Sequence, residues 1–180
     1  PEAVVKAIAE LARHKVQIVK IWVDDQQGNM WKLRRPNYKA IIDEAHKNKM
    51  RVFAHIHDLD DAKRLIEAGV DAFGHSVRDR EVDAALIKMM KEKKVPLFAT
   101  LVREESGFMY GKDKTFVDDE HLKRHLAPEI VSGLKDPAFV TKTQSDPKRP
   151  AFEAMLKMAQ KNLKTLAAAG VTIAFGTDSG

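Results

Sequence analysis

The strongest constraint on the fold is a repeated alternation between short β-branched runs and longer segments with helical periodicity. Five runs rich in Val, Ile, Phe and Ala are predicted strands, at 16–23, 51–57, 70–75, 95–101 and 171–178. Helices are predicted over about 2–14, 36–49, from Asp58 to Gly69, 79–94 and 150–169. Pro36 suits a first helical turn, Asp58 can cap the helix that follows it, and Gly69 suits a left-handed helix end. Strands separated by helices imply right-handed crossovers, so the sequence predicts an α/β fold with a parallel sheet.

A doubly wound sheet and a (β/α)8 TIM-like barrel both satisfy this alternation. Polar residues distinguish them, because Lys20, His55, His57, His75 and Asp178 fall at or near the carboxyl ends of the predicted strands. Barrel enzymes keep their sites at that end. No glycine-rich phosphate loop follows a strand, which argues against a dinucleotide fold. We therefore predict a barrel fragment over residues 1–180, with five of about eight strands and truncation at both ends.

The stretch 102–149 is too long for an ordinary connection between a strand and a helix. It carries aromatic, proline and charged residues, and insertions of this size at the site end often form lids or pockets. We predict an insertion there. Arg78, Arg80 and Arg103, which follow strand ends, are candidates for binding a substrate carboxylate, although ordinary surface charges of this kind are at least as common.

Composition excludes several classes of function. The 180 residues contain no cysteine, which rules out disulfides and thiolate metal sites, and the compartment stays open between cytoplasm and periplasm. No apolar run approaches the roughly 18 residues that span a membrane, and no signal peptide is visible. The net charge of +5 is scattered among acidic residues along helices, which indicates solvated surfaces and no nucleic-acid partner. Assembly as a homo-oligomer is left open.

Lys20 lies inside the first predicted strand, where alternation places Ile18, Lys20 and Trp22 on one face. Because parallel sheets are buried on both faces, we expect Lys20 to be desolvated. A buried ammonium group is costly, so it should pair with a carboxylate, lose its proton or be modified. A neutral amine can take up carbon dioxide as a metal-bridging carbamate, or form a Schiff base with a carbonyl substrate. The pattern leaves these alternatives open.

The histidines on the next two strands are candidate metal ligands. His55 and His57 are two residues apart and share a face, and His75 follows Gly74 at the end of the next strand. Asp178 ends the last strand. Each residue alone is more typical of a structural role, and His57 most of all. Together, a lysine, two or three histidines and an aspartate on neighbouring strand ends suit metal ligation with an acid/base group beside it.

At this point the sequence resembles the amidohydrolase superfamily, and most of all the branch with prolidase-like dipeptidases and relatives of imidazolonepropionase. The resemblance covers nearly the whole chain except the insertion. It is carried by the segments Val19–Asp25 (VKIWVDD), Ala54–His57 (AHIH), Glu67–Asp71 (EAGVD), Gly74–Val77 (GHSV) and Phe175–Ser179 (FGTDS). The ordered set is fairly specific, whereas no single segment is.

The resemblance implies a binuclear site with two divalent, zinc-like ions. Carboxylated Lys20 would bridge them from barrel strand four, His55 and His75 would ligate from strands five and six, and the insertion would follow strand seven. Asp178, on strand eight, would bind metal and transfer the proton. His57 falls one position beyond the ligand pattern, in the second shell or the substrate pocket. The H-x-H pair of the family's first strand is absent, so the chain alone is expected to bind metal poorly and to be inactive.

The function that follows is metal-dependent hydrolysis of an amide bond in a dipeptide, an Xaa-Pro-like peptide or a cyclic amide, by metal-activated hydroxide. Two alternatives remain. In the first, Lys20 is the Schiff-base lysine of an aldolase-like barrel with histidines as acid/base groups. In the second, the barrel is a non-catalytic binding module that gains no stability from metal.

Overall fold

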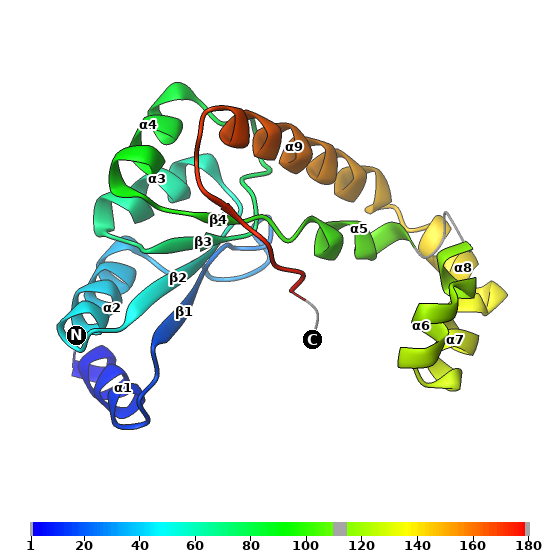
Figure 1. Ribbon diagram of the computed structural model, residues 1–180, viewed down its shortest axis with the longest axis horizontal. Coiled ribbons are helices and arrows are strands. Elements are labelled where there is room, and N and C mark those ends of the chain that lie inside the picture. The colour runs from blue at the N-terminus through cyan, green and yellow to red at the C-terminus, as the bar shows by residue number, and fades with distance from the viewer. Residues whose placement is uncertain (1, 110–114, 179–180) are drawn as a thin grey trace. The chain divides into compact units, whose positions relative to one another are not determined.

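Five parallel strands form one sheet in the computed structural model, which describes residues 2–109 and 115–178 (Figure 1). The strands are β1 (Ile18–Val23), β2 (Arg51–Ile56), β3 (Ala72–Gly74), β4 (Leu97–Phe98) and β5 (Ile173–Ala174). They lie side by side in chain order, and every neighbouring pair is parallel. The predicted α/β fold with a parallel sheet is therefore confirmed, and each predicted strand is present with shorter bounds.

Helices alternate with these strands along the chain. They are α1 (Glu2–Arg13), α2 (Arg35–Lys47), α3 (Leu59–Ala68), α4 (Ala84–Lys93) and α9 (Arg149–Ala168). Helices α1 to α4 pack against one another in sequence order, as Figure 1 shows. Pro36 lies in the first turn of α2, where its missing N–H costs nothing. Gly69 ends α3 with a left-handed backbone, at φ 98°, as its position predicts.

Two expectations about helix starts were wrong. Asp58 lies at the cap position of α3, but its side chain makes no cap bond, and Asp79 of the following loop accepts the Leu59 N–H instead. The carboxylate of Asp58 is taken up by Lys32. Helix α4 begins only at Ala84, where the Asp83 side chain accepts the Leu86 N–H, so the predicted start at 79 was too early.

The hydrophobic core lies on the helix-covered face of the sheet. In β1 the buried positions are Val19, Ile21 and Val23, and in β2 they include Val52, Ala54 and Ile56. Ile42 of α2 and Leu65 of α3 are fully buried against this face. Full burial of a Val, Leu or Ile side chain contributes about 1.5–3 kcal/mol to folding. The helices therefore pack on the face of the sheet to which the alternating apolar residues of the strands point.

The opposite face of β1 is exposed, which corrects the expectation that both faces are buried. Ile18 is 56% exposed, Trp22 is 41% exposed, and Lys20 between them is also exposed. The reason is that the described helices cover the other face, and β1 pairs with β2 alone at the edge of the sheet.

The described residues divide into two compact units. The first comprises residues 2–101 and 158–177, and the second comprises 102–109, 115–157 and 178. The second unit holds short helices: α5 (Leu101–Met109), the 3-10 turn η1 (Thr115–Asp118), α6 (Glu120–His125), α7 (Pro128–Lys135) and α8 (Pro137–Gln144). Asp119 and Asp136 cap α6 and α8 through their side chains. Residues 110–114, within the predicted insertion, lie outside the described residues.

Candidate functional site

Two histidines from neighbouring strands meet at the carboxyl end of the sheet. His55 belongs to β2, and His75 follows β3 directly. The register pairs His55 with Gly74, so the two imidazoles are brought together, with ring centroids 4.3 Å apart in an edge-on arrangement. Both residues are only 2% exposed. The structure thus places two of the residues singled out in the sequence in direct contact.

His55 is held by two residues from the end of β1. Its Nε2 lies 2.9 Å from Oδ2 of the buried Asp24. The indole of Trp22 stacks on the imidazole at 3.6 Å with the planes 13° apart. Sequence reasoning gave neither residue a role. The register between β1 and β2, which pairs Trp22 with His55, would have identified these contacts. That register depends on how the two strands align in the sheet, which the sequence does not specify.

The charges in this pair follow from burial and hydrogen bonding. Burial acts to raise the pKa of Asp24, but the hydrogen bonds with His55 and with the Gln26 N–H outweigh it and lower that pKa to about 2. Burial lowers the pKa of His55, although the Asp24 hydrogen bond opposes that change. Asp24 is therefore an anion at neutral pH beside an imidazole that favours its neutral form, the form that binds metals.

His75 and its partner both occupy unusual backbone conformations. Nδ1 of His75 lies 2.5 Å from the hydroxyl oxygen of Thr100, which follows β4. The φ angles are 70° at His75, 46° at Thr100 and 57° at Asp178, all in the left-handed region. Such conformations are costly for residues other than glycine, particularly for β-branched threonine. They persist where surrounding structure over-determines them, which happens most often at functional sites.

Lys20 lies on the exposed face of β1, two residues before Trp22. Its Nζ is 5.9 Å from the ring centroid of Phe53, and its charge is one of the influences that lower the pKa of His55. Phe53 occupies the space over Gly74, where an added Cβ would lie 2.3 Å from the ring. The absence of a side chain at Gly74 therefore lets the Phe53 ring approach the backbone closely.

His57 is partly buried at the start of the loop after β2. Its Nδ1 lies 2.7 Å from Oδ1 of Asp58, and the other carboxylate oxygen of Asp58 accepts from Lys32 at 2.6 Å. Lys32 also donates to Asp61 at 2.7 Å. These contacts connect the loops after β1 and β2. The predicted place of His57 in the second shell or substrate pocket stays a prediction.

The remaining sequence candidates have varied positions. Arg78 is buried and donates to the carbonyl oxygens of Ile56 and Ser76, so its guanidinium fastens the loop after β3. Arg80 is exposed and ion-paired with Asp60. Asp178 and Arg103 belong to the second compact unit, so the role of Asp178 beside the histidines stays a prediction. Ser179, the last residue of the FGTDS motif, lies outside the described residues.

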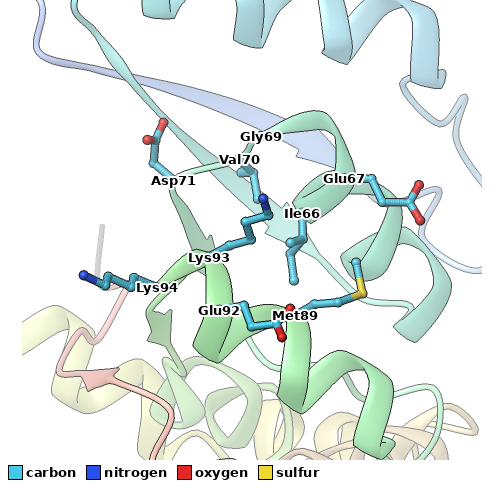
Figure 2. A pocket seen from close by; sticks show the side chains of 9 residues that line it. All are labelled: Ile66, Glu67, Gly69, Val70, Asp71, Met89, Glu92, Lys93 and Lys94. Atoms are coloured by element: carbon cyan, nitrogen blue, oxygen red, sulfur yellow. The ribbon is translucent and has the colours of Figure 1, made fainter.

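A hollow of about 390 Å³ lies at the opposite end of the sheet. Its walls come from the end of α3, the segment before β3 and the end of α4, as Figure 2 shows. The residues are Ile66, Glu67, Gly69, Val70, Asp71, Met89, Glu92, Lys93 and Lys94. None of its charged side chains is buried, and none of the sequence candidates lines it. This hollow is therefore not the candidate site.

The second ring nitrogen of His55 is the feature that bears on metal binding. Nδ1 of His55 is buried and has no hydrogen-bond partner among the described residues. An unpaired buried nitrogen is costly unless a ligand binds it. No group of three or more His, Cys, Asp or Glu side chains converges within residues 2–109 and 115–178. The described residues thus bring two imidazoles together, one of them with a buried, unpartnered nitrogen that a metal ion could take up, but no third His, Asp or Glu side chain completes a metal-binding group with them. No helix in the described part has the length and apolar character to cross a bilayer.

Known proteins resemble this chain in part. No protein-family model matches it. An uncharacterized protein of Mycobacterium tuberculosis is 36% identical over 104 residues, which is 56% of this chain and 27% of the relative. An uncharacterized protein of Mycobacterium bovis gives the same values. The chain therefore spans about a quarter of the length of these relatives.

Solved structures of amidohydrolase and prolidase type share the fold over almost the whole chain. The A. niger ochratoxinase matches with a TM-score of 0.67 and 22% identity, over 98% of this chain and 34% of that one. A Xaa-Pro dipeptidase matches with a TM-score of 0.64 and 22% identity, over 98% and 37%. Molinate hydrolase matches with a TM-score of 0.61 and 16% identity, over 100% and 33%. The chain therefore has the fold of part of these enzymes.

Proposed function

We propose that this chain carries part of the active site of a metal-dependent hydrolase of the amidohydrolase superfamily, which cleaves amide bonds in small molecules or dipeptides. The observation that carries the proposal is the buried, unpartnered Nδ1 of His55 beside the ring of His75. The shared fold with ochratoxinase and a Xaa-Pro dipeptidase supports the same class of chemistry.

The arrangement of the strands favours a segment of a (β/α)8 barrel. The sheet order follows the chain without the reversal that defines a doubly wound sheet. The exposed face of β1 bears Lys20 and Trp22, and that face would line the interior of a closed barrel. The five strands would then be the fourth to the eighth, with His55 and His75 at the end where barrel enzymes keep their sites.

The metal ligands would be His55 through Nδ1, because Asp24 takes its Nε2, and the neighbouring His75, whose Nδ1 lies beside the Thr100 hydroxyl. Lys20, as a carbamate, and Asp178 would complete the set. Two divalent ions of the zinc type would supply an activated water and would polarise the amide carbonyl. The pKa of water bound to zinc is about 7 in known sites. His57 would not bind the metal ions but would lie next to their ligands or in the substrate pocket.

The side chains have separate tasks in this scheme. The hydrogen bond with Asp24 would orient the lone pair of His55, and the contact with the Thr100 hydroxyl would hold the ring of His75. The low pKa of Asp24 keeps its carboxylate ionised while His55 binds. Asp178 would take the proton from the attacking water at its carboxylate and give it to the amine nitrogen as the carbon–nitrogen bond breaks.

Hydrolysis by the protein expressed from its complete gene tests this proposal. Release of amine from Xaa-Pro dipeptides, other dipeptides and a cyclic amide is measured before and after chelation, and again after Zn²⁺ is restored. We expect activity that chelation removes and Zn²⁺ restores, and its loss in Lys20→Ala but not in Lys6→Ala, an exposed lysine of α1. Activity that survives chelation, with Lys20 trapped by borohydride and a carbonyl substrate, would contradict it.

A further inference from the structure

Asp24 is the most buried carboxylate near the candidate site, and no sequence pattern assigned it a role. It follows Val23 at the end of β1 and is 5% exposed. Both oxygens of its carboxylate are used: Oδ1 accepts the Gln26 N–H at 2.7 Å, and Oδ2 lies 2.9 Å from Nε2 of His55. A buried carboxylate with this geometry is committed to one orientation.

The surroundings fix that orientation further. The Trp22 indole donates its Nε1–H to the Asp24 carbonyl oxygen at 3.0 Å while its ring stacks on His55. The Arg78 guanidinium lies 3.9 Å from Oδ2 of Asp24 and is itself held by the Ile56 carbonyl oxygen at 2.9 Å. The imidazole of His55 is therefore restrained both in its plane and along its Nε2 edge.

This contact determines which nitrogen of His55 carries the proton. An ionised carboxylate can only accept hydrogen bonds, so Nε2 of His55 must be the donor. In the neutral ring, the lone pair then lies on Nδ1. Nδ1 is the atom that is buried without a partner among the described residues. The Asp24 carboxylate thus holds the His55 ring through Nε2 and leaves the lone pair of Nδ1 able to bind a ligand.

We propose that Asp24 is a positioning residue that locks His55 in the Nε2–H tautomer, with the Nδ1 lone pair presented to a metal ion beside His75. The proposal rests on the proposed metal site, but the tautomer itself can be measured without any metal. Carboxylates that accept from a ligating histidine typically change metal affinity by about 10–100-fold when they are removed.

The substitution Asp24→Asn should reverse the tautomer while it preserves the shape of the side chain. The Gln26 N–H requires an acceptor at Oδ1, which turns the amide nitrogen of the asparagine toward His55. Nε2 must then accept, and the proton moves to Nδ1, where it blocks metal binding. Asp25→Asn is a matched control, because Asp25 is the next residue and accepts the Gly28 N–H without contacting His55.

The experiment is a two-bond ¹H–¹⁵N correlation spectrum of histidine-labelled, metal-free protein, expressed from its complete gene and recorded at mildly alkaline pH. The His55 signals are assigned by their loss in His55→Asn. We expect the Nε2–H pattern in the wild type and in Asp25→Asn, and the Nδ1–H pattern in Asp24→Asn. An Nδ1–H pattern in the wild type overturns the proposal even if Asp24→Asn fails to fold.

Zn²⁺ titration of the same proteins supplies the second readout. We expect the affinity of Asp24→Asn to fall by about 10–100-fold, while Asp25→Asn binds as the wild type does. A reversed tautomer with unchanged Zn²⁺ affinity overturns the role of Asp24 toward the metal. If the wild type binds no Zn²⁺ but shows the Nε2–H pattern, the proposed hydrolase function fails while the tautomer lock stands.

Discussion

The two ends of the sheet are built in different ways. At the amino end, every strand is preceded by the same helix-ending turn, with a left-handed residue whose N–H bonds the carbonyl three residues earlier. The next N–H bonds the carbonyl five residues earlier, which completes a Schellman motif. The left-handed residues are Lys15, Lys49, Gly69, Lys94 and Gly170, and the residues after them are Val16, Met50, Val70, Val95 and Val171. The hydrogen bonds that form these turns all join residues close together in the sequence.

At the carboxyl end, the loops are fastened by side chains from distant parts of the chain. Lys32 connects the loop after β1 to Asp58 and Asp61. Asn162 of α9, 1% exposed, accepts the Val82 N–H and donates to the carbonyl oxygens of Val77 and Arg80, which holds the loop after β3. This end also carries the left-handed His75 and the unpartnered Nδ1 of His55.

The two ends therefore differ in the contacts that stabilise them. Left-handed residues other than glycine occur at both ends, but the carboxyl end also keeps a costly buried nitrogen, and its loops are held by residues far apart in the sequence. The unpartnered buried nitrogen lies at the carboxyl end of the strands, the end at which barrel enzymes keep their sites.

The largest expected effect is at Asn162. Asn162→Leu removes three hydrogen bonds and leaves the Val82 N–H and two carbonyl oxygens without their partner, so we expect a loss of about 2–4 kcal/mol in unfolding free energy. Denaturant unfolding measures it. Lys161→Met, which breaks only the exposed pair with Glu81 on the same loop, should cost at most about 1 kcal/mol. Equal costs would remove the contrast between the two ends.

A smaller effect is expected at Lys32. Lys32→Met should cost about 1–2 kcal/mol, because the partly exposed ion pairs with Asp58, Asp61 and Asp25 are lost and the three carboxylates no longer share a cation. Burial acts to raise the pKa of Asp58, but hydrogen bonds from Lys32 and His57 lower it overall. Its contribution to stability is therefore present above the unfolded pKa of about 3.9 and is lost as pH falls through the lower folded value.

The wild type should accordingly lose more thermal stability than Lys32→Met between mildly acidic and strongly acidic pH. The raised pKa of Lys32 makes its own contribution complete below its ordinary value and lost only at very alkaline pH, so both contributions are fully present near neutral pH and neither varies with pH there. Parallel melting curves for the two proteins across acidic pH would contradict the assignment of Lys32 as the fastening residue.

The smallest effects are expected at the amino end and should be local. Lys49→Gly removes the strain of a left-handed lysine, at φ 59°, and should stabilise the fold by about 0.5–1 kcal/mol. Gly69→Ala should do the reverse, because the side chain has room but the φ of 98° is unfavourable. Chemical denaturation checks both. A destabilising Lys49→Gly would show that these turns depend on more than backbone conformation.

The same contrast explains which features the sequence could predict. Gly69 and Pro36 carry their own conformational meaning, and β-branched runs bounded by helices predict a parallel sheet, so these features were confirmed. Asp58 was wrong as a helix cap because Lys32, far away in the sequence, competes for its carboxylate. Burial of Lys20 was wrong because the described helices cover the other face of β1.

The candidate site was predictable only in part. Alternation and strand ends identified His55 and His75, and the structure brings them together. Asp24 and Trp22 were missed because their contacts depend on the register between β1 and β2, a long-range property. The participation of Lys20 as a carbamate and of Asp178 as the acid/base group stays a prediction.

Metal content tests most directly whether His55 and Lys20 hold metal ions. The protein expressed from its complete gene, grown with bicarbonate, is analysed by elemental mass spectrometry beside His55→Asn, Lys20→Ala and the control His46→Asn, an exposed histidine paired with Asp71. We expect about two divalent ions per chain in the wild type and in His46→Asn, and their loss in the other two folded variants. A metal-free wild type, or equal metal content in His55→Asn and His46→Asn, would contradict it.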